Sequence, residues 1–517
     1  MWSLNSDFLM VLQLEKLTKI MSIPPAWKSV ILIVIFFILL YKYLTRNHSY
    51  WKARGVPFEP PKFLAGSLWE VFCGRQHIGK HLGYLYGKYN KAPYFGIFVM
   101  GKPYLVLRNP EIIKSITIRD FPNFDDRTFA CDKNADPMSG NSLFVLKNPE
   151  WKNIRNKLTP IFTSGKLKLM LYIMKKTGVE VEKYLEKYDN QVIEIKEVSS
   201  KYMTDLVASC FFGFDTNSFK DQDSEFRLVS RRMFEFDIFN SISLFSYFFV
   251  PKMVSWFKLK LLDTNFLKDV FYTTLRNRAS TNQKRNDFVD LLLQLKENFN
   301  ENNNGIHFDT NCMVSQAITF FIAGFETTSN AIAFALYELC LRPDCQEKLR
   351  REIGESLPND VEITFESIQK MKYLDMVLSE TLRRYPFGPF LNRECKEDYV
   401  IKETGLVIEK GTPILIPIDG IHNDPEYYSD PEKFDPERFS DGIKYKSQSC
   451  QYLPFGSGPR NCIGDRFGLI CAKVGIIYIL RKFRVERCET TPDPVVLDPK
   501  SPFMMPLGGL NMILKKV

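Results

Sequence analysis

Histidine is scarce in this chain, and the sequence patterns that bind zinc or a nicotinamide cofactor are missing. Five histidines occur in 517 residues, and none belongs to an HExxH or a CxxC…HxxxH pattern, which argues against a zinc enzyme. Neither a glycine-rich dinucleotide fingerprint nor a flavin module is present. If the protein carries out redox chemistry, its electrons must therefore come from a partner.

Regular cysteine spacing and a strong charge bias are also missing. The eleven cysteines are an odd number scattered along the chain, which argues against a disulfide framework and for a reducing compartment. The net charge is +9 without a polybasic tail, and we expect no nucleic-acid partner. A hydrophobic fraction of 45% and a charged fraction of 25% are typical of a globular protein.

One long apolar run is present, near the N-terminus. Residues 30–41, VILIVIFFILLY, contain no charge and are bracketed by Lys28 and Lys42. A membrane span requires ~20 residues, but flanking lysines can snorkel and so lengthen a shorter run. A cleaved signal peptide is the alternative, but no small-residue cleavage site follows the run. We therefore expect an N-terminal extension with an uncleaved membrane anchor at residues 1–54, and one domain at 55–517.

Basic residues flank the anchor on both sides. Arg46 and Arg54 follow the apolar run, which favours a cytosolic position for the domain. Lys16 and Lys19 precede the run, which weakens that inference. The residues before position 21 have no clear role, and Met21 is an alternative start.

The rest of the chain is predicted to be mainly helical. A stiff proline-rich hinge at 57–61 precedes the domain, and no repeat or second domain boundary follows it. Helices are expected at 310–341, which is apolar nearly all round and closed by Pro343, and at 366–384, which carries one apolar stripe. Short strands are expected near 94–108 and in the last fifteen residues. The fold class is therefore mainly α with small β-sheets (α+β).

Three residue pairs stand out in the predicted helices. They are Glu326 with Thr327 inside AGFETT, Glu380 with Arg383, and Trp151 with Arg155. Each has an ordinary structural explanation, namely a buried acid bonded to a neighbour, a helix-surface ion pair, and plain packing. Alone, none of them identifies a function.

The most informative stretch is PFGSGPRNCIG, residues 454–464. Its glycines allow the backbone to bend and to approach another group closely. Cys462 can supply a thiolate, and Arg460 can supply a guanidinium group to an anion. The pattern Phe-x-x-Gly-x-Arg-x-Cys-x-Gly fixes five positions, and a chance match in this chain is on the order of 1 in 100,000. The stretch is either a tight turn or a cradle for a flat, anionic group that binds a thiolate.

Taken together, these motifs resemble the cytochrome P450 superfamily. The match covers nearly the whole chain in the family's order: an N-terminal anchor, WKNIR, AGFETT, ETLR, FDPERF and FGSGPRNCIG. The intervening sequence is closest to the insect family-six enzymes of the microsomal detoxification clan. The hinge departs from the family's Pro-Pro-Gly-Pro pattern, since PFEPP lacks the glycine. The resemblance implies a cytochrome P450 fold, with one large haem-binding domain behind the anchor.

The resemblance assigns roles to Cys462, to its neighbours in the sequence and to several basic residues. Cys462 would be the axial thiolate ligand of the iron of haem b, shielded by Phe455, and Gly464 would allow close approach to the ring. The cysteine would stand at the start of a helix from Ile463 onward, whose dipole stabilises the thiolate. The haem propionates would be bound by Trp151, Arg155, Arg393 and Arg460.

Two further sets of residues gain roles in the same way. Glu326 and Thr327 would form the catalytic acid–alcohol pair that relays protons to the dioxygen substrate. Glu380, Arg383 and Arg438 would form a buried structural network behind the cysteine loop.

The family's substrate pocket would draw on apolar residues from several segments. In this chain they are Phe129, Phe320, Phe321, Ala323, Phe387, Leu391 and Phe503. Such a pocket suits a bulky lipophilic molecule. The aromatic segment 239–257 would be a membrane-dipping lid, with ordinary packing as the alternative.

The function implied is that of a haem-thiolate monooxygenase acting on a lipophilic substrate, in xenobiotic and insecticide detoxification or in endogenous lipid and hormone metabolism. Electrons would come from NADPH through NADPH–cytochrome P450 reductase, with cytochrome b5 as an additional donor, at the cytosolic face of the endoplasmic reticulum (microsomal) membrane. The alternatives are a reductase-independent haem-thiolate isomerase or dehydratase, and a non-catalytic haem carrier or sensor. The intact pair of Glu326 and Thr327 argues against both.

Overall fold

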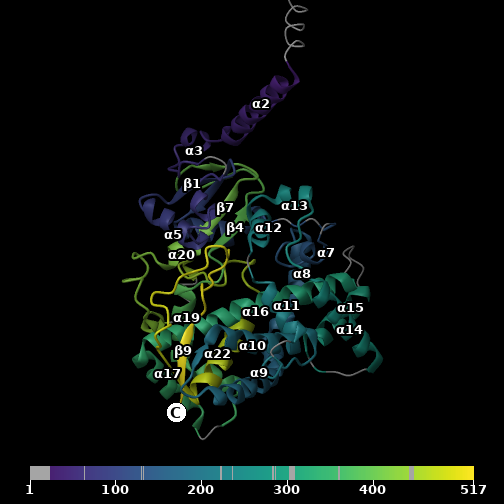
Figure 1. Ribbon diagram of the computed structural model, residues 1–517, viewed down its shortest axis with the longest axis vertical. Coiled ribbons are helices and arrows are strands. Elements are labelled where there is room, and N and C mark those ends of the chain that lie inside the picture. Colours follow the sequence, from purple (N-terminus) through teal and green to yellow (C-terminus); the bar gives the residue numbers. More distant parts are fainter. Residues whose placement is uncertain are drawn as a thin grey trace, which may run out of the picture.

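Helices form most of the molecule, as the sequence predicts, and small sheets complete the fold (Figure 1). The computed structural model describes residues 24–62, 65–129, 131, 133–134, 136–221, 224–235, 237–281, 285, 287–301, 309–358, 361–441 and 448–517. The predicted extension before residue 24 lies outside these ranges. The helices are α2 (Pro25–Thr45), α3 (Tyr50–Ala53), α4 (Trp69–Phe72), α5 (Ile78–Lys88), α6 (Pro110–Lys114), α7 (Pro137–Gly140), α8 (Glu150–Leu158), α9 (Ser164–Leu185), α10 (Ile195–Val207), α11 (Glu225–Arg232), α12 (Ile238–Phe249), α13 (Pro251–Phe257), α14 (Asn265–Thr281), α15 (Phe288–Glu301), α16 (Thr310–Leu341), α17 (Pro343–Ser356), α18 (Phe365–Lys370), α19 (Lys372–Arg384), α20 (Ile418–His422) and α22 (Asp465–Leu480).

Helix α16 is the central element of the helical part. Its bounds are those expected from the sequence, because Asp309 caps its first turn by accepting a hydrogen bond from Cys312 N at 2.8 Å, and Pro343 opens the next helix. Helices α10, α19 and α22 pack against it, and Figure 1 shows it crossing the middle of the molecule. Since 72% of its most apolar stretch is buried, α16 is a core helix and not a second membrane span.

The expected helix at 366–384 is divided in two, which corrects the prediction. Helix α18 ends at Lys370, and α19 begins at Lys372 after one non-helical residue. The carboxylate of Glu352, on α17, accepts hydrogen bonds from Tyr373 N at 2.8 Å and from Leu374 N at 2.9 Å. A side chain from another helix thus caps α19, and no local sequence pattern announces such a cap.

The largest sheet joins strands from distant parts of the chain. Strands β1 (Tyr94–Val99) and β2 (Lys102–Leu107) are the short strands expected near 94–108, and they pair as an antiparallel hairpin. Strand β7 (Pro413–Pro417) pairs with β2 in parallel and with β4 (Phe390–Glu394) antiparallel, which gives the order β1-β2-β7-β4. The last strand, β9 (Asn511–Lys516), confirms the prediction for the C-terminus and lies between β3 (Val192–Glu194) and β8 (Phe483–Glu486). A third sheet pairs β5 (Tyr399–Val400) with β6 (Val407–Ile408).

The predicted anchor forms α2, which stands apart from the rest of the molecule (Figure 1). None of its most apolar stretch is buried against protein. Beyond α2 the chain is fixed to the large sheet, because Asn47 Nδ2 donates to Gly101 O at 2.9 Å and Trp51 Nε1 donates to Ile97 O at 3.2 Å. The proline-rich segment also pairs with β1, through a hydrogen bond from Gly96 N to the carbonyl oxygen of residue 57 at 2.8 Å. It is therefore packed on the sheet and is not a free hinge.

Candidate functional site

The cysteine loop, defined here as residues 453–464, consists of consecutive tight turns. Gly456 N donates to Leu453 O at 3.0 Å, which closes the first turn. Cys462 N donates to Phe455 O at 2.8 Å. The backbone of the predicted iron ligand is therefore held by the loop itself, before any group binds to its side chain.

Glycine is required at one predicted position of the loop and not at another. Gly458 has a φ of +74°, and a Cβ atom there would lie 1.8 Å from Thr117 O, so a side chain does not fit. At Gly464 the nearest neighbour of such a Cβ atom is Phe162 Cε1 at 3.8 Å, an ordinary contact. No protein atom of the described residues therefore demands glycine at 464, and its role toward a bound ring stays a prediction.

The helix after the loop does less for Cys462 than the sequence predicts. Helix α22 begins at Asp465 and not at Ile463, so the cysteine lies outside its first turn. Burial raises the pKa of the Cys462 thiol to about 11, and this outweighs the opposing effects of a hydrogen bond from Gly464 N and of nearby Arg155. These stabilising contacts do not ionise the thiol by themselves, so a bound metal ion has to displace the proton.

Cys462 and one face of α16 are accessible in a part of the molecule that is otherwise buried. Cys462 is exposed, although burial dominates the pKa of its thiol, so the side chain faces a space enclosed by protein. Ala323 in the middle of α16 is also exposed, and Thr327, one turn later, is partly exposed. Helix α22 passes next to the AGFETT segment, since a Cβ atom at Gly468 would lie 3.5 Å from Oγ1 of the buried Thr328. The fold thus brings the cysteine loop and the AGFETT segment to the same region.

The acid and the alcohol of the predicted catalytic pair face different neighbours. Thr327 Oγ1 donates to Ala323 O at 2.6 Å. Glu326 is buried, and its Oε1 pairs with Lys196 Nζ of α10 at 2.7 Å and accepts a hydrogen bond from Asn330 Nδ2 at 3.1 Å. Consecutive helical residues project ~100° apart, so the carboxylate lies toward α10 while the hydroxyl lies on the accessible face. In this structure the ordinary structural explanation describes both side chains.

Lys196 is a residue of the site that no motif in the sequence indicates. Besides the pair with Glu326, its Nζ contacts Ser329 Oγ at 2.9 Å and Ser200 Oγ at 3.0 Å. The two helices that carry Lys196 and Glu326 lie far apart in the sequence, and no motif links them. A lysine within a half-apolar helix was the one available signal.

Two of the predicted propionate-binding residues, Trp151 and Arg155, lie beside the cysteine loop, and a third, Arg460, belongs to the loop. Arg155 donates to Asn461 O and to Asn461 Oδ1, both at 2.9 Å. Arg460 donates to Leu146 O, and its guanidinium carbon lies 4.6 Å from the centroid of the Trp151 ring. Helix α8 therefore presents its Trp–Arg pair to the loop that carries Cys462.

Unpaired buried donors in this region fit an anionic group. Arg393 Nε and the Nε and Nη1 atoms of Arg460 are buried and have no hydrogen-bond partner within the described residues. Burial lowers the pKa of Arg460 to about 10, and burial together with Arg460 lowers that of Arg393 to about 9. Arg127, which the sequence analysis misses, belongs to the same group, because burial followed by repulsion from Arg460 lowers its pKa well below the usual value. Mutually repelling guanidinium groups, two of them with unpaired nitrogen atoms, match the carboxylates of haem.

Three of the predicted pocket residues form one aromatic group with a residue of α12. Phe248 lies 4.4 Å from Phe129 and 6.4 Å from Phe503 between ring centroids, and Phe503 stacks on Phe387 at 4.5 Å. Leu391 lies near the cysteine loop, because its Cδ2 would be 3.5 Å from a Cβ atom at residue 456. The aromatic group thus joins three of the predicted pocket residues to α12, which is part of the segment 239–257 that is predicted to form a lid.

The two phenylalanines of α16 that were predicted to line the pocket, Phe320 and Phe321, are both buried. Phe321 is fully buried, stacks with Phe325 at 6.0 Å and contacts Phe226 of α11 at 5.0 Å. It is a core residue, which corrects its assignment to the pocket. Phe320 is also buried, but it contacts Phe162 at 5.1 Å and so stays close to the start of α22.

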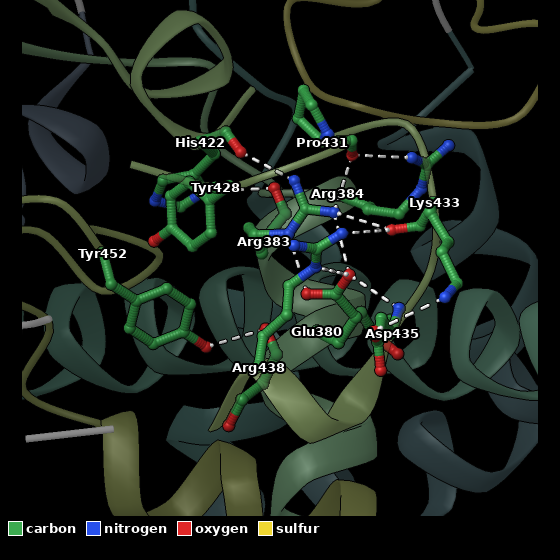
Figure 2. A network of polar contacts seen from close by, with 12 residues as sticks. Glu380, Arg383, Arg384, His422, Tyr428, Pro431, Lys433, Asp435, Arg438 and Tyr452 are labelled. Carbon is green, nitrogen blue, oxygen red and sulfur yellow. Dashed lines mark hydrogen bonds and ion pairs between the residues drawn. The ribbon is translucent and has the colours of Figure 1, made fainter. Parts of the chain in front are cut away.

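The structure brings the three predicted network residues together behind the loop (Figure 2). Glu380 and Arg383 of α19 are fully buried and form a two-point pair, with Nε–Oε2 at 2.7 Å and Nη2–Oε1 at 2.8 Å. Arg438 brings its Nε to 3.4 Å from Glu380 Oε1. Arg383 also donates to His422 O at 2.7 Å and to Pro431 O at 2.8 Å. Figure 2 shows both guanidinium groups around the one carboxylate.

Comparison with known proteins agrees with this geometry. Residues 56–512 match the family model described as "Cytochrome P450". Cytochrome P450 6j1 of Blattella germanica is 38% identical, over 93% of this chain and 96% of the relative. Cytochrome P450 6k1 of the same species is 36% identical over 94% and 97%, and the probable cytochrome P450 6g2 of Drosophila melanogaster is 35% identical over 91% and 95%. The chain therefore belongs to the cytochrome P450 family of monooxygenases, within the range of the insect family-six enzymes, as its motifs predict.

Proposed function

We propose that this protein inserts one oxygen atom of O2 into a lipophilic substrate, using electrons that NADPH–cytochrome P450 reductase delivers from NADPH, with cytochrome b5 as a second donor. The observation that carries the proposal is the pairing of an inward-facing Cys462 with the accessible face of α16 around Ala323 and Thr327. The substrate class rests on the aromatic group of Phe129, Phe248, Phe387 and Phe503. The proposal includes both detoxification of foreign compounds and metabolism of endogenous lipids or hormones.

Each part of the site would have a separate task. When bound, haem supplies a thiolate-ligated iron centre that activates dioxygen. Cys462 would hold the iron, and Arg393 and Arg460 would hold the carboxylates with the nitrogen atoms that lack partners in the protein. Phe455 would exclude water near the Cys462 sulfur, and Trp151 would exclude it near the carboxylates.

The proton-relay task falls on Thr327 more than on Glu326. The Thr327 hydroxyl donates to Ala323 O, which leaves its oxygen lone pairs free to accept a hydrogen bond from a water on the accessible face. Glu326 is paired with Lys196 and would join the relay only when that ion pair opens. We therefore assign to Thr327 the task of ordering the proton donor. Glu326 would take part only after its ion pair with Lys196 has opened.

The location proposed is the endoplasmic reticulum membrane, with the domain on its cytosolic face. Helix α2 supplies the apolar span. The aromatic segment 239–257 forms α12 and α13, and Phe239, Trp256 and Phe257 are 82%, 73% and 66% exposed. In Figure 1, α13 lies at the end of the molecule from which α2 projects. Exposed aromatic side chains at that end support a lid that dips into lipid, from which a lipophilic substrate enters.

A reconstitution tests the proposed function directly. The full chain, in vesicles with the reductase, is expected to show a strongly red-shifted Soret band in its reduced carbon-monoxide complex. It should also consume NADPH faster when a bound lipophilic compound shifts its spectrum. Thiolate spectra without any reductase-dependent product from a broad panel of compounds would contradict the monooxygenase proposal and favour a haem carrier or sensor.

Thr327→Ala is expected to separate electron consumption from product formation. The variant should keep the haem, the thiolate spectrum and NADPH consumption, because none of these needs the hydroxyl. Without an ordered proton donor, electrons should be diverted to hydrogen peroxide, and product per NADPH should fall about tenfold. Peroxide and product are measured together, per NADPH consumed.

A matched control for Thr327 lies two turns earlier on α16. Thr319 is also partly exposed, and its Oγ1 donates to Ser315 O at 2.7 Å, the same bond to the preceding turn. Thr319→Ala should leave the ratio of peroxide to product unchanged. Equal ratios in wild type and both variants would show that the Thr327 hydroxyl does no more than satisfy a carbonyl.

The reductase is expected to dock next to α8, where Lys152 is exposed and Lys157 is partly exposed. Lys152→Glu combined with Lys157→Glu should slow reduction of the haem severalfold and weaken its dependence on salt, because an acidic partner is steered by such charge. Stopped-flow reduction at several salt concentrations measures both effects. Lys187→Glu combined with Lys516→Glu makes the same charge change on exposed lysines at the far end of α9. If the two double variants behave alike, the docking site is elsewhere.

A further inference from the structure

A buried histidine joins the Glu380–Arg383 network to the cysteine loop. His422, the last residue of α20, is fully buried. Its Nδ1 lies 3.1 Å from Arg383 O, and its Nε2 lies 2.8 Å from Leu453 N, the first residue of the loop. Its own carbonyl accepts a hydrogen bond from Arg383 Nη1 at 2.7 Å. One side chain therefore contacts the end of α19 and the start of the loop at the same time.

The partners of His422 fix the position of its proton. Leu453 N is a backbone donor, so Nε2 must be the acceptor, and Arg383 O is an acceptor, so Nδ1 must carry the hydrogen. A second proton on Nε2 would face the N–H of Leu453, which has no lone pair to accept it. The ring is thus a donor on one side and an acceptor on the other, in a single neutral tautomer.

The bonds made by the imidazole continue into the loop. Leu453 O accepts from Gly456 N at 3.0 Å, and the turn that follows places Phe455 O to accept from Cys462 N at 2.8 Å. On the other side, Arg383 is held by the two oxygens of Glu380. Hydrogen bonds, joined through the covalent structure of Arg383 and Leu453, therefore connect the buried carboxylate to the backbone of the cysteine, and His422 lies in the middle of the series.

We propose that His422 is a positioning residue, which sets the position of the cysteine loop relative to the helical core and so keeps the Cys462 sulfur in place to ligate iron as a thiolate. The inference rests on the proposed haem-thiolate function. It assigns to His422 a task that Glu380, Arg383 and Arg438 cannot perform alone, because none of the hydrogen bonds described for those side chains goes to residues 453–464.

A nearby tyrosine supplies the comparison that separates positioning from general stability. Tyr428 is as buried as His422, and its hydroxyl donates to Gln451 O at 2.9 Å, two residues before the loop begins. Tyr428→Phe removes one hydrogen bond to the same segment and keeps the aromatic ring. Figure 2 shows His422 and Tyr428 on the same side of the Arg383 guanidinium group.

Three substitutions at His422 test the individual bonds. His422→Phe keeps a ring and removes both bonds. His422→Asn places an amide near the position of Nδ1, so it retains the bond to Arg383 O and cannot reach Leu453 N. His422→Gln is long enough to present its oxygen near the position of Nε2 and to restore the bond to Leu453 N.

The measurement uses the full-length protein loaded with haem. The red-shifted Soret band of the reduced carbon-monoxide complex reports thiolate ligation, and its rate of loss is followed at fixed mild urea, while a urea titration gives the unfolding midpoint. We expect band loss about tenfold faster in His422→Phe and His422→Asn than in Tyr428→Phe, at similar unfolding midpoints. His422→Gln should recover most of the difference. The comparison of His422→Asn with His422→Gln is sufficient if His422→Phe does not retain haem.

Two results would overturn the inference. One is band loss in the His422 variants that merely follows their unfolding midpoints, as in Tyr428→Phe. The other is a His422→Gln variant no better than His422→Asn. Both leave the proposed function intact, because the wild-type band is still present. A wild-type protein that binds haem without this band would instead refute the haem-thiolate function, and the inference with it.

Discussion

Cys462→Ser is expected to abolish thiolate ligation and reduce product formation to background. A serine hydroxyl has almost the same size as a thiol, so the loop turns that involve Gly456 and Phe455 should persist. The change is chemical, because an alcohol is a far weaker acid than a thiol and stays neutral beside iron. The burial that raises the pKa of the Cys462 thiol to about 11 makes an anionic alcohol less favourable still. The reduced carbon-monoxide spectrum and product formation with reductase measure the two effects.

A buried cysteine nearby gives the matched control for this substitution. Cys450 lies just before the cysteine loop, is fully buried, and has its Sγ 3.5 Å from Ser457 Oγ. Cys450→Ser should keep the red-shifted band and most of the activity. If Cys462→Ser retained that band, or if Cys450→Ser lost it instead, the assignment of Cys462 as the iron ligand would be wrong.

Local sequence signals predicted the parts of the fold that depend on neighbouring residues. The central helix has the predicted bounds, because Asp309 and Pro343 define its ends within the sequence itself. The break between α18 and α19 was not predictable, since the cap at Tyr373 N comes from Glu352 on another helix. The same holds for the second partner of strand β2, which is β7, far along the chain.

The same distinction between local and distant partners applies to the residues of the site. The sequence predicted the cysteine loop because Gly458 lies so close to Thr117 O that no side chain fits there. A position that accepts only glycine forms part of a recognisable motif. The sequence did not predict toward which neighbours the Glu326 side chain points. Adjacent helical residues necessarily face different neighbours, and its partner Lys196 belongs to another helix. The motif thus places the acid next to Thr327 in sequence, while the fold decides which side it occupies.

The bridging histidine shows a third kind of limit. No pattern around His422 distinguishes it from a buried histidine that merely packs, because both of its partners are backbone groups, Arg383 O and Leu453 N. Backbone groups carry no residue identity, so contacts of this kind are visible only in three dimensions.

Arg383→Ala is expected to lower the free energy of unfolding by about 3–5 kcal/mol and to yield protein with little haem. The Glu380 carboxylate would keep only Asp435 N at 2.9 Å and the more distant Arg438 Nε at 3.4 Å. The substitution also removes the guanidinium donor of the His422 carbonyl, while Pro431 O keeps a hydrogen bond from Arg384 Nη1 at 3.1 Å. The urea midpoint followed by tryptophan fluorescence, together with haem content after purification, measures the loss.

An exposed pair of the same chemistry is the control that attributes this effect to burial. Arg231 and Glu235 of the α11 region form an i, i+4 pair at 2.9 Å, with side chains 65% and 57% exposed. Because water screens that pair, Arg231→Ala should cost no more than about 0.5 kcal/mol and should retain haem. Replacing both buried partners, Glu380→Leu with Arg383→Met, removes the unpaired charge and should recover part of the stability lost in Arg383→Ala. If Arg383→Ala instead matched Arg231→Ala in both urea midpoint and haem content, the buried pair would contribute no more than a surface ion pair. The network would then not be what fixes the core behind the cysteine loop.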